Sequence, residues 1–473
     1  MTLPSSTPDH SRRTQCLALL LLVVLALAGM ALLWYITPYG MGLVNDSIAY
    51  IGGARNLLAG NGYSRLTGNG SPQPISNYPP MFSIAIAAVS LLGLESLKAV
   101  WVLNIFLFGA NIFLAGLILL QMTRKPAFAL LGGLFFAVSE PLFGFHSLAM
   151  SEPLYLFLGF LCLLFLKSSL TRPGWGWPVA AGVMAGLAFL TRYVGVALFG
   201  TALLGFLFLL KTWKERIRSG LSFLAGGLPP VAAWLVRNLL VAENAANRQL
   251  AWHPIPADKI NEGLMNFWGW LLPERGGLVE RLLPVWGAVL ALLLAALAVG
   301  VVVALVQYHR GRITLPQNAF LLGWIFAIQA LVYLATLVFT LTLVDASPIF
   351  EDRILSPFYV SVLLLGVAFL AWLWSHRHWA ARLASVLLAV ALLFSLAEDS
   401  VDAIRDLHRE GQGFASSSWR ESRMIQAVES FRQEIIYSNK PTAIYVLTDK
   451  PAYYLLSPIN PATQQPREGY EQD

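Results

Sequence analysis

The chain has 473 residues, of which 57% are hydrophobic and only 12% are charged. Soluble domains contain about 25% charged residues, so this composition and the repeated long apolar runs exclude a soluble protein and indicate a polytopic membrane protein. The net charge of +6 comes from short basic clusters between apolar runs, which fits the connections of a membrane protein better than a nucleic-acid surface. Cys16 and Cys162 both fall at or within apolar runs, so they predict neither a disulfide framework nor a metal site.

The first apolar run, 17–36, resembles a cleavable signal peptide because it follows Arg12 and Arg13. The run is about twenty residues long, which is enough to cross the ~30 Å hydrocarbon core. It also ends at Trp34 and Tyr35, and aromatic residues are enriched at the membrane interface. We therefore predict that this run is a retained first membrane span.

The basic clusters between the apolar runs predict the topology. The apolar stretch 80–94 is short and begins at a double proline, so we expect it to lie at the interface. Leaving it out places every basic cluster on one side of the membrane, in agreement with the positive-inside rule, whereas counting it inverts every cluster after the first. The predicted fold is an all-α polytopic membrane protein with about eleven transmembrane helices, a cytoplasmic N-terminus and an external C-terminus. The predicted spans are 17–36, 98–121, 127–141, 147–166, 176–191, 194–210, 219–240, 283–306, 316–341, 355–374 and 379–397.

The chain divides into a transmembrane domain, 1–397, and a small external α/β tail, 398–473. The first external loop, 37–97, is expected to hold interfacial helices. In the tail, residues 418–436 have the pattern of an amphipathic helix, and 435–437 and 443–447 that of two short strands. The predicted topology also brings the turns before Ser151 and at 351–353 to the outer face.

Asp46 in the first loop is the candidate general base, since a carboxylate that removes a proton from an acceptor hydroxyl contributes on the order of 10²–10⁴ in rate. The alternative is a structural role, because Asn45, Asp46 or Ser47 can each begin the helix that runs through Leu58, and aspartate is a favoured N-cap. Both roles can coexist, because a cap would also fix the direction of the carboxylate.

Arginines are the candidates for contacts with a phosphate, because the guanidinium group has a fixed fork of donors. Arg353 begins the tenth span and is either a phosphate ligand or an interface anchor paired with its neighbours. Arg192 lies between two spans, where an arginine is costly unless it is paired or functional. Arg55 is a third candidate, although on a helix it faces away from Asp46 and towards the headgroups.

Four further residues are candidates for the lining of the site. Glu152 opens the fourth span, and its simpler interpretation as a first-turn acid is favoured over a second site carboxylate. Tyr78 precedes Pro79-Pro80, and its membership of the aromatic belt is slightly favoured over a place in the site. The other two are Tyr50 and Asp352.

These segments resemble landmarks of the GT-C superfamily of membrane glycosyltransferases, which includes protein O-mannosyltransferases and the aminoarabinose transferase of lipid A. The first loop is similar to theirs in Asp46-Ser47-(x)2-Tyr50, in 54–63 and in Tyr78-Pro79-Pro80. The later segments 151–154, 191–193 and 352–357 are similar to landmarks of the bacterial members.

The resemblance implies a sugar donor linked to polyprenyl phosphate, an acceptor hydroxyl on a glycan, lipid or protein, and no nucleic acid. It implies an inverting transfer with Asp46 as the base, on the outer face of the cell (inner) membrane. The chain departs from the family at Asn45, where several relatives have a second acid, and at Tyr78, where relatives often have Lys or His. The first departure weakens the case for a metal; we expect no cofactor, with a divalent ion left open. The second departure shifts the phosphate contacts to Arg353 and Arg192.

A transporter or flippase of lipid-linked glycans is the alternative function. Such a protein would place charged or polar residues near the centres of its spans and would break helices in matching halves. The polar residues of this sequence crowd at the outer ends of the predicted spans, which favours chemistry at the membrane surface.

Overall fold

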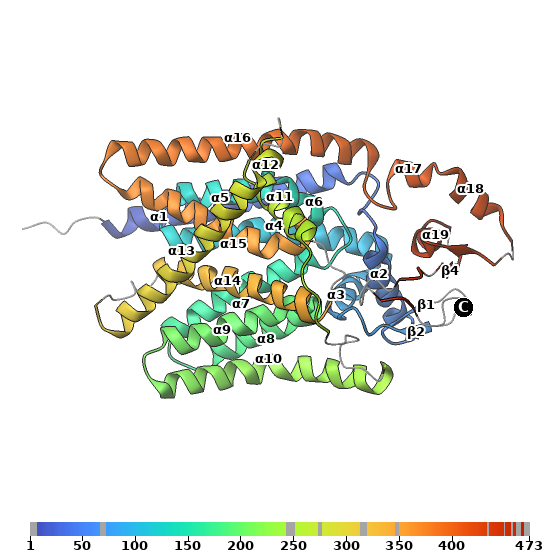
Figure 1. Cartoon of the computed structure of the whole chain (residues 1–473), viewed down its shortest axis with the longest axis horizontal. Coiled ribbons are helices and arrows are strands. Elements are labelled where there is room, and N and C mark those ends of the chain that lie inside the picture. The colour runs from blue at the N-terminus through green and yellow to red at the C-terminus, as the bar shows by residue number, and fades with distance from the viewer. Residues whose placement is uncertain are drawn as a thin grey trace, which may run out of the picture.

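The computed structural model describes residues 7–66, 72–242, 251–272, 277–312, 319–345, 350–432, 435–448, 450–455, 457–459 and 465–467. Most of these residues form long helices that run roughly along one axis (Figure 1). The bundle consists of α1 (Thr7–Ile36), α4 (Ser96–Thr123), α5 (Pro126–Val138), α6 (Glu140–His146), α7 (Glu152–Thr171), α8 (Gly176–Thr191), α9 (Val196–Leu209), α10 (Trp213–Ala242), α13 (Leu283–His309), α14 (Ala319–Leu343), α15 (Asp352–Ser375) and α16 (Trp379–Glu410).

Each predicted span overlaps one of these helices, but the predicted number of eleven is not confirmed. Within the described ranges, eight helices are long and apolar enough to cross a membrane, and a ninth span results if the pair α5–α6, bent by 60°, crosses as one unit. Helices α8 and α9 are apolar but short, with 16 and 14 residues. The stretch predicted to lie at the interface forms the ten-residue helix α3 (Met81–Ser90).

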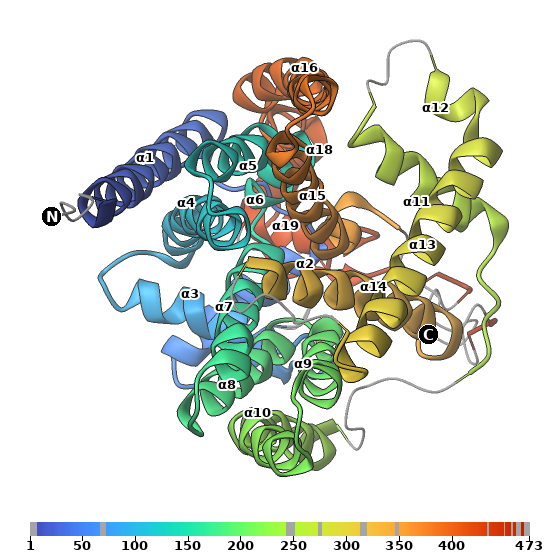
Figure 2. The same ribbon diagram turned by 90° about the vertical axis from the view of Figure 1, so that its left-hand side faces the viewer.

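The helices form one bundle with a peripheral flank. The end-on view in Figure 2 shows α1, α4 and α5 on one side, α8, α9 and α10 on another, and α14 and α15 between them. Helix α13 lies at the edge and is mostly exposed, as expected for a helix that faces lipid. The closest packing joins α8 and α10, where Gly182 lies against the backbone of Phe223 and small residues allow such close approach.

The small elements of the first loop and of the tail gather at one end of the bundle (Figure 1). The first loop contributes α2 (Asn45–Leu58) and the antiparallel strands β1 (Ser64–Leu66) and β2 (Pro72–Pro74). The connection before α13 contains α11 (Ala257–Gly269) and α12 (Leu278–Arg281). The tail forms α17 (Ser417–Arg420), α18 (Arg423–Ser430), β3 (Tyr437–Ser438), α19 (Pro441–Thr448) and β4 (Tyr453–Tyr454), with β3 and β4 parallel. Figure 1 shows α2, α19 and β4 beside one another at this end.

Two predictions for the tail are wrong. The predicted strand 443–447 belongs to helix α19, because Pro441 occupies its first position, where proline favours a helix, and Ala443 and Ile444 are buried. The predicted helix 418–436 is two short helices, α17 and α18, which are separated at Glu421–Ser422. The preceding helix α16 continues past residue 397 to Glu410.

Hydrogen bonds attach the tail to the first loop and to the turn before α7. The backbone amide of Phe414 donates to the carbonyl oxygen of Leu43 at 2.7 Å. The Ser147 hydroxyl donates to Gln412 Oε1 at 2.6 Å. The Thr442 hydroxyl donates to Asn45 Oδ1 at 2.7 Å, at the first residue of α2. The tail therefore covers the N-terminal end of α2, where Asp46 lies.

Candidate active site

Asp46 does not cap helix α2. Val44 is the N-cap residue, and its backbone amide donates to the Ser47 hydroxyl at 3.0 Å. The Asp46 carboxylate accepts a hydrogen bond from the Tyr78 hydroxyl at Oδ1 (2.7 Å) and one from Arg353 Nη1 at Oδ2 (3.2 Å). The interpretation of Asp46 as a cap alone is wrong, because its carboxylate is directed across the site.

Arg353 lies among three carboxylates. Its Nε donates to Glu351 Oε2 at 2.7 Å, and its Nη1 lies 3.2 Å from Asp46 Oδ2 and 4.0 Å from Glu152 Oε1. The side chain is 28% exposed, so it is open to a ligand. Arg353 does pair with a chain neighbour, as the anchor interpretation predicted, but it also joins the first loop to α7.

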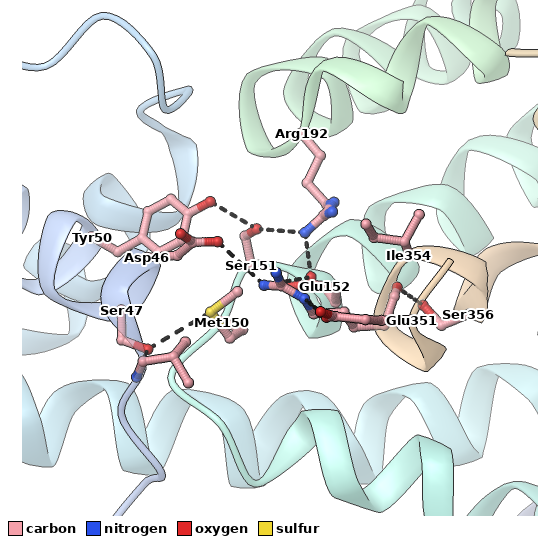
Figure 3. Close-up of polar contacts among 12 residues, drawn as sticks. Asp46, Ser47, Tyr50, Met150, Ser151, Glu152, Arg192, Glu351, Ile354 and Ser356 are labelled. Atoms are coloured by element: carbon pink, nitrogen blue, oxygen red, sulfur yellow. Dashed lines mark hydrogen bonds and ion pairs between the residues drawn. The ribbon is translucent and has the colours of Figure 1, made fainter. Parts of the chain in front are cut away.

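Glu152 and Arg192 form a buried ion pair at the base of the site (Figure 3). Glu152 is only 1% exposed, and a carboxylate so deeply buried requires charged or hydrogen-bonding partners. Arg192 also donates from Nη1 to the Ser151 hydroxyl at 3.4 Å, and that hydroxyl lies 3.2 Å from the Tyr50 hydroxyl. Glu152 occupies the first turn of α7, as the simpler interpretation predicted, and it also contacts Arg192 and Arg353.

Tyr78 lies beside Asp46 and Tyr50, while the choice between a place in the site and a place in the aromatic belt stays a prediction. Its ring packs edge-on against Tyr50, with the ring centroids 5.4 Å apart. Burial, together with the neighbouring Asp46 carboxylate, raises the pKa of the Tyr78 phenol. The phenol therefore keeps its proton at neutral pH and donates it in the hydrogen bond to Asp46.

Two predicted residues lie elsewhere. Arg55 Nη2 pairs with Glu95 Oε1 at 2.7 Å, which agrees with the expectation that it faces away from Asp46. Asp352 accepts a hydrogen bond from Trp270 Nε1 at 2.8 Å and lines a separate acidic cavity of about 470 Å³, with Glu140 and Asp402.

The site has the groups needed to bind a phosphate and to accept a proton. Arg192 and Arg353 each use Nη1 for the contacts above, and the described residues offer no hydrogen-bond acceptor to either Nη2, which leaves these donors for a ligand. Asp46 is partly exposed and supplies a carboxylate beside them. Among the described residues, no three His, Cys, Asp or Glu side chains are grouped so as to hold a metal ion.

Sequence reasoning missed the part of the site that the tail provides. Thr442, Tyr445 and Tyr453 line a cavity next to Tyr78, although none of them was a predicted site residue. The helical start at Pro441 was the available signal, but the apolar β-branched run after it favoured a strand.

Comparison with known proteins supports the predicted resemblance. The family model for dolichyl-phosphate-mannose-protein mannosyltransferase matches residues 76–245. None of the curated proteins matches the chain. ArnT from Cupriavidus metallidurans, solved with undecaprenyl phosphate, has a TM-score of 0.54 at 13% identity, over 92% of this chain and 85% of that protein.

The oligosaccharyltransferase AglB from Archaeoglobus fulgidus is also similar in structure. It was solved with an inhibitory peptide and a dolichol phosphate, and it has a TM-score of 0.55 at 10% identity. The match covers 91% of this chain but only 64% of the AglB chain. Both proteins are GT-C glycosyltransferases, so the chain is a multi-pass membrane protein with the GT-C fold.

Proposed function

We propose that the protein transfers a sugar from a polyprenyl-phosphate donor to an acceptor hydroxyl at the outer face of the cell membrane. The mannosyltransferase family model matches the segment that holds Tyr78, Glu152 and Arg192. Solved proteins of the same fold were captured with undecaprenyl phosphate and dolichol phosphate. The observation that carries the proposal is the placement of the Asp46 carboxylate between Tyr78 and Arg353.

The reaction that fits these residues is a single displacement at the anomeric carbon. Asp46 takes the proton of the acceptor hydroxyl while its oxygen forms the new bond to the anomeric carbon. The bond to the phosphate oxygen breaks on the opposite side, and the lipid phosphate leaves with the electron pair. Attack opposite the leaving group inverts the configuration of the sugar.

The two arginines stabilise the leaving phosphate, because charge-assisted donors fixed in advance favour the transition state. Glu152 contacts both guanidinium groups, at Arg192 directly and at Arg353 over 4.0 Å, and so holds them in place. No proton donor is needed at the phosphate, since a phosphate leaves as an anion. One carboxylate base and two arginines are therefore sufficient.

The proposed site lies at a bundle end, as the enzyme hypothesis requires. A transporter would break helices in matching halves, whereas among the described residues the bent pair is α5–α6. The polar groups of the site come from the ends of α2, α7, α8 and α15. These observations favour surface chemistry over passage through the bundle.

The test is transfer of radiolabelled sugar by the purified protein in lipid nanodiscs. A panel of undecaprenyl-phosphate sugars serves as donors, with cell-envelope fractions as acceptors. We expect Asp46→Asn to lower kcat by about 10²–10⁴ while undecaprenyl-phosphate binding is kept. Asp258→Asn is the matched control, because Asp258 is an exposed aspartate at the same position of helix α11 as Asp46 in α2.

The control variant is expected to transfer sugar at the wild-type rate. Full activity in Asp46→Asn would remove Asp46 as the base. Absence of transfer by the wild type with every donor, together with movement of lipid-linked glycan across vesicles, would support the transporter instead.

A further inference from the structure

A cavity of about 460 Å³ lies between the first loop and the tail. Its volume is in the range of small-ligand sites, about 300–1,000 Å³. Tyr78 and Arg65 line it from the first loop, and Thr442, Tyr445 and Tyr453 line it from the tail. Neither part of the chain forms this cavity alone.

The cavity adjoins the proposed base on the side away from the arginine pair. Tyr78 lines the cavity and donates its hydroxyl to Asp46 Oδ1, whereas Arg353 contacts Oδ2. Asn45, the residue before Asp46, also lines the cavity and is held by Thr442 of the tail. Arg192 and Arg353 do not line this cavity. Asp46 itself does not line the cavity, and Tyr78 lies between its carboxylate and this second region.

The second region has the chemistry of a saccharide site. Tyrosine rings offer flat apolar faces to the C–H face of a sugar ring, and their hydroxyls bind polar groups. Asn45, Asn56 and Thr442 add amide and hydroxyl groups to the lining. The lining is mainly apolar, with these polar groups set into it, and a sugar ring likewise combines an apolar C–H face with hydroxyls.

The charge of the lining favours an anionic ligand. Arg55 and Arg65 line the cavity, and the described lining contains no aspartate or glutamate. Arg55 is neutralised by Glu95 at 2.7 Å. Arg65 is exposed, and the described residues provide no ion pair for it. The opposite sign occurs in the acidic cavity beside Asp352, so the positive lining here is a local property.

We propose that this cavity binds the acceptor, an anionic saccharide, with its ring against Tyr445 and Tyr453 and its negative group at Arg65. The proposal rests on the proposed function for the identity of the reacting hydroxyl, which would face Asp46 past Tyr78. The tail then has a role in acceptor specificity, and Thr442, Tyr445 and Tyr453 are specificity-determining residues.

Binding to the full-length protein in nanodiscs tests the proposal without any transfer reaction. The probes are two tetrasaccharides of equal length, chitotetraose and one that alternates glucuronate with N-acetylglucosamine. We expect the anionic probe to bind at least tenfold more tightly than the neutral one. Arg65→Gln should remove that preference, and Tyr453→Ala should weaken both probes by about tenfold. Undecaprenyl phosphate binding should stay unchanged in both variants.

Arg420→Gln is the control for charge, because Arg420 also lies in this region but packs over the Tyr39 ring and does not line the cavity. It should bind both probes as the wild type does. Unchanged undecaprenyl phosphate binding shows that each variant is folded.

Three results would overturn the proposal: equal binding of the two probes, no binding by the wild type at millimolar concentration, or wild-type binding by Arg65→Gln. Transfer by Asp46→Asn tests the proposed function, whereas binding of the two probes tests the acceptor site. The two proposals can therefore fail independently.

Discussion

At the scale of single residues, a neighbouring side chain decides what Asp46 can do. Aspartate near the start of a helix commonly bonds to free backbone amides. In this chain the Ser47 hydroxyl accepts from the Val44 amide, so the Asp46 carboxylate is available to Tyr78 and Arg353. The sequence showed three residues that could begin the helix, and the rotamers that distinguish them depend on tertiary contacts.

Removal of the Tyr78 hydroxyl tests how strongly it orients the base. A hydrogen bond to a charged group contributes about 1.5–3 kcal/mol, so Tyr78→Phe should lower kcat by about ten- to a hundredfold with little change in donor KM. Tyr39→Phe is the control, because the Tyr39 hydroxyl has only a long contact of 3.4 Å to the Arg409 carbonyl oxygen. An unchanged kcat in Tyr78→Phe would show that Asp46 is positioned without it.

The raised pKa of Tyr78 has a consequence for the pH profile. A raised pKa in the folded state means that the folded protein favours the neutral phenol over the phenolate. The contribution of this preference to the stability of the folded state is complete below the ordinary tyrosine pKa of about 10. It is lost only as the pH rises from that value towards the folded-state pKa. We therefore expect the wild type and Tyr78→Phe to have the same shape of kcat against pH between pH 5 and about pH 9. A change in kcat near neutral pH that is present in the wild type and absent from Tyr78→Phe would contradict this expectation.

Glu152 is expected to matter for stability as well as for activity. Glu152→Gln leaves the partly exposed Arg192 with only the Ser151 hydroxyl as a partner, and breaking an ion pair whose carboxylate is buried costs up to about 3–5 kcal/mol. The Tm of the purified protein in detergent should fall clearly. Glu95→Gln removes an ion pair whose carboxylate is 50% exposed, so its effect should stay within about 1 kcal/mol. Similar Tm values for the two variants would show that the buried pair adds no stability.

At the scale of elements, hydropathy identifies the long helices because a lipid-exposed helix must be apolar over its whole length. Hydropathy fails where tertiary packing determines the structure. In α19, Ile444 packs against Ile425 and Val428 of α18 and Ala443 packs in the main core, and the segment does not form a strand. The bend between α5 and α6 was not predicted either, although Pro141 follows it directly.

The contact between α8 and α10 offers a test of packing. A Cβ atom at Gly182 would collide with the backbone of Phe223, so Gly182→Ala should lower stability by about 1–3 kcal/mol through overpacking. Gly220 lies in α10 with no atom within 4 Å of an added Cβ, so Gly220→Ala should leave the Tm unchanged or raise it slightly. Equal Tm shifts would argue against close backbone contact of the two helices. The Tm is measured in the same detergent for all variants.

At the scale of the whole molecule, the topology predicted which residues could meet. Asp46, Glu152, Arg192 and Arg353 are far apart in the chain, and the charge pattern placed all of them at one face before any contact was known. The direction of each side chain needed the structure, since Arg55 and Asp352 share that face but contact Glu95 and Trp270. The tail cavity was beyond sequence reasoning, because its contact from Thr442 to Asn45 spans 397 residues.

The orientation of the bundle is the prediction on which the external site depends. In a background with Cys16→Ser and Cys162→Ala, we introduce Arg420→Cys in the tail or Arg310→Cys at the end of α13, both exposed. A membrane-impermeant maleimide should label the first in intact cells and the second only after permeabilisation, because basic clusters stay on the cytoplasmic side. The reverse pattern would place the Asp46 site in the cytoplasm. The sugar donor would then have to be available at the inner leaflet. The proposed roles of Asp46 and the two arginines would be unchanged, but the reaction would take place on the cytoplasmic side.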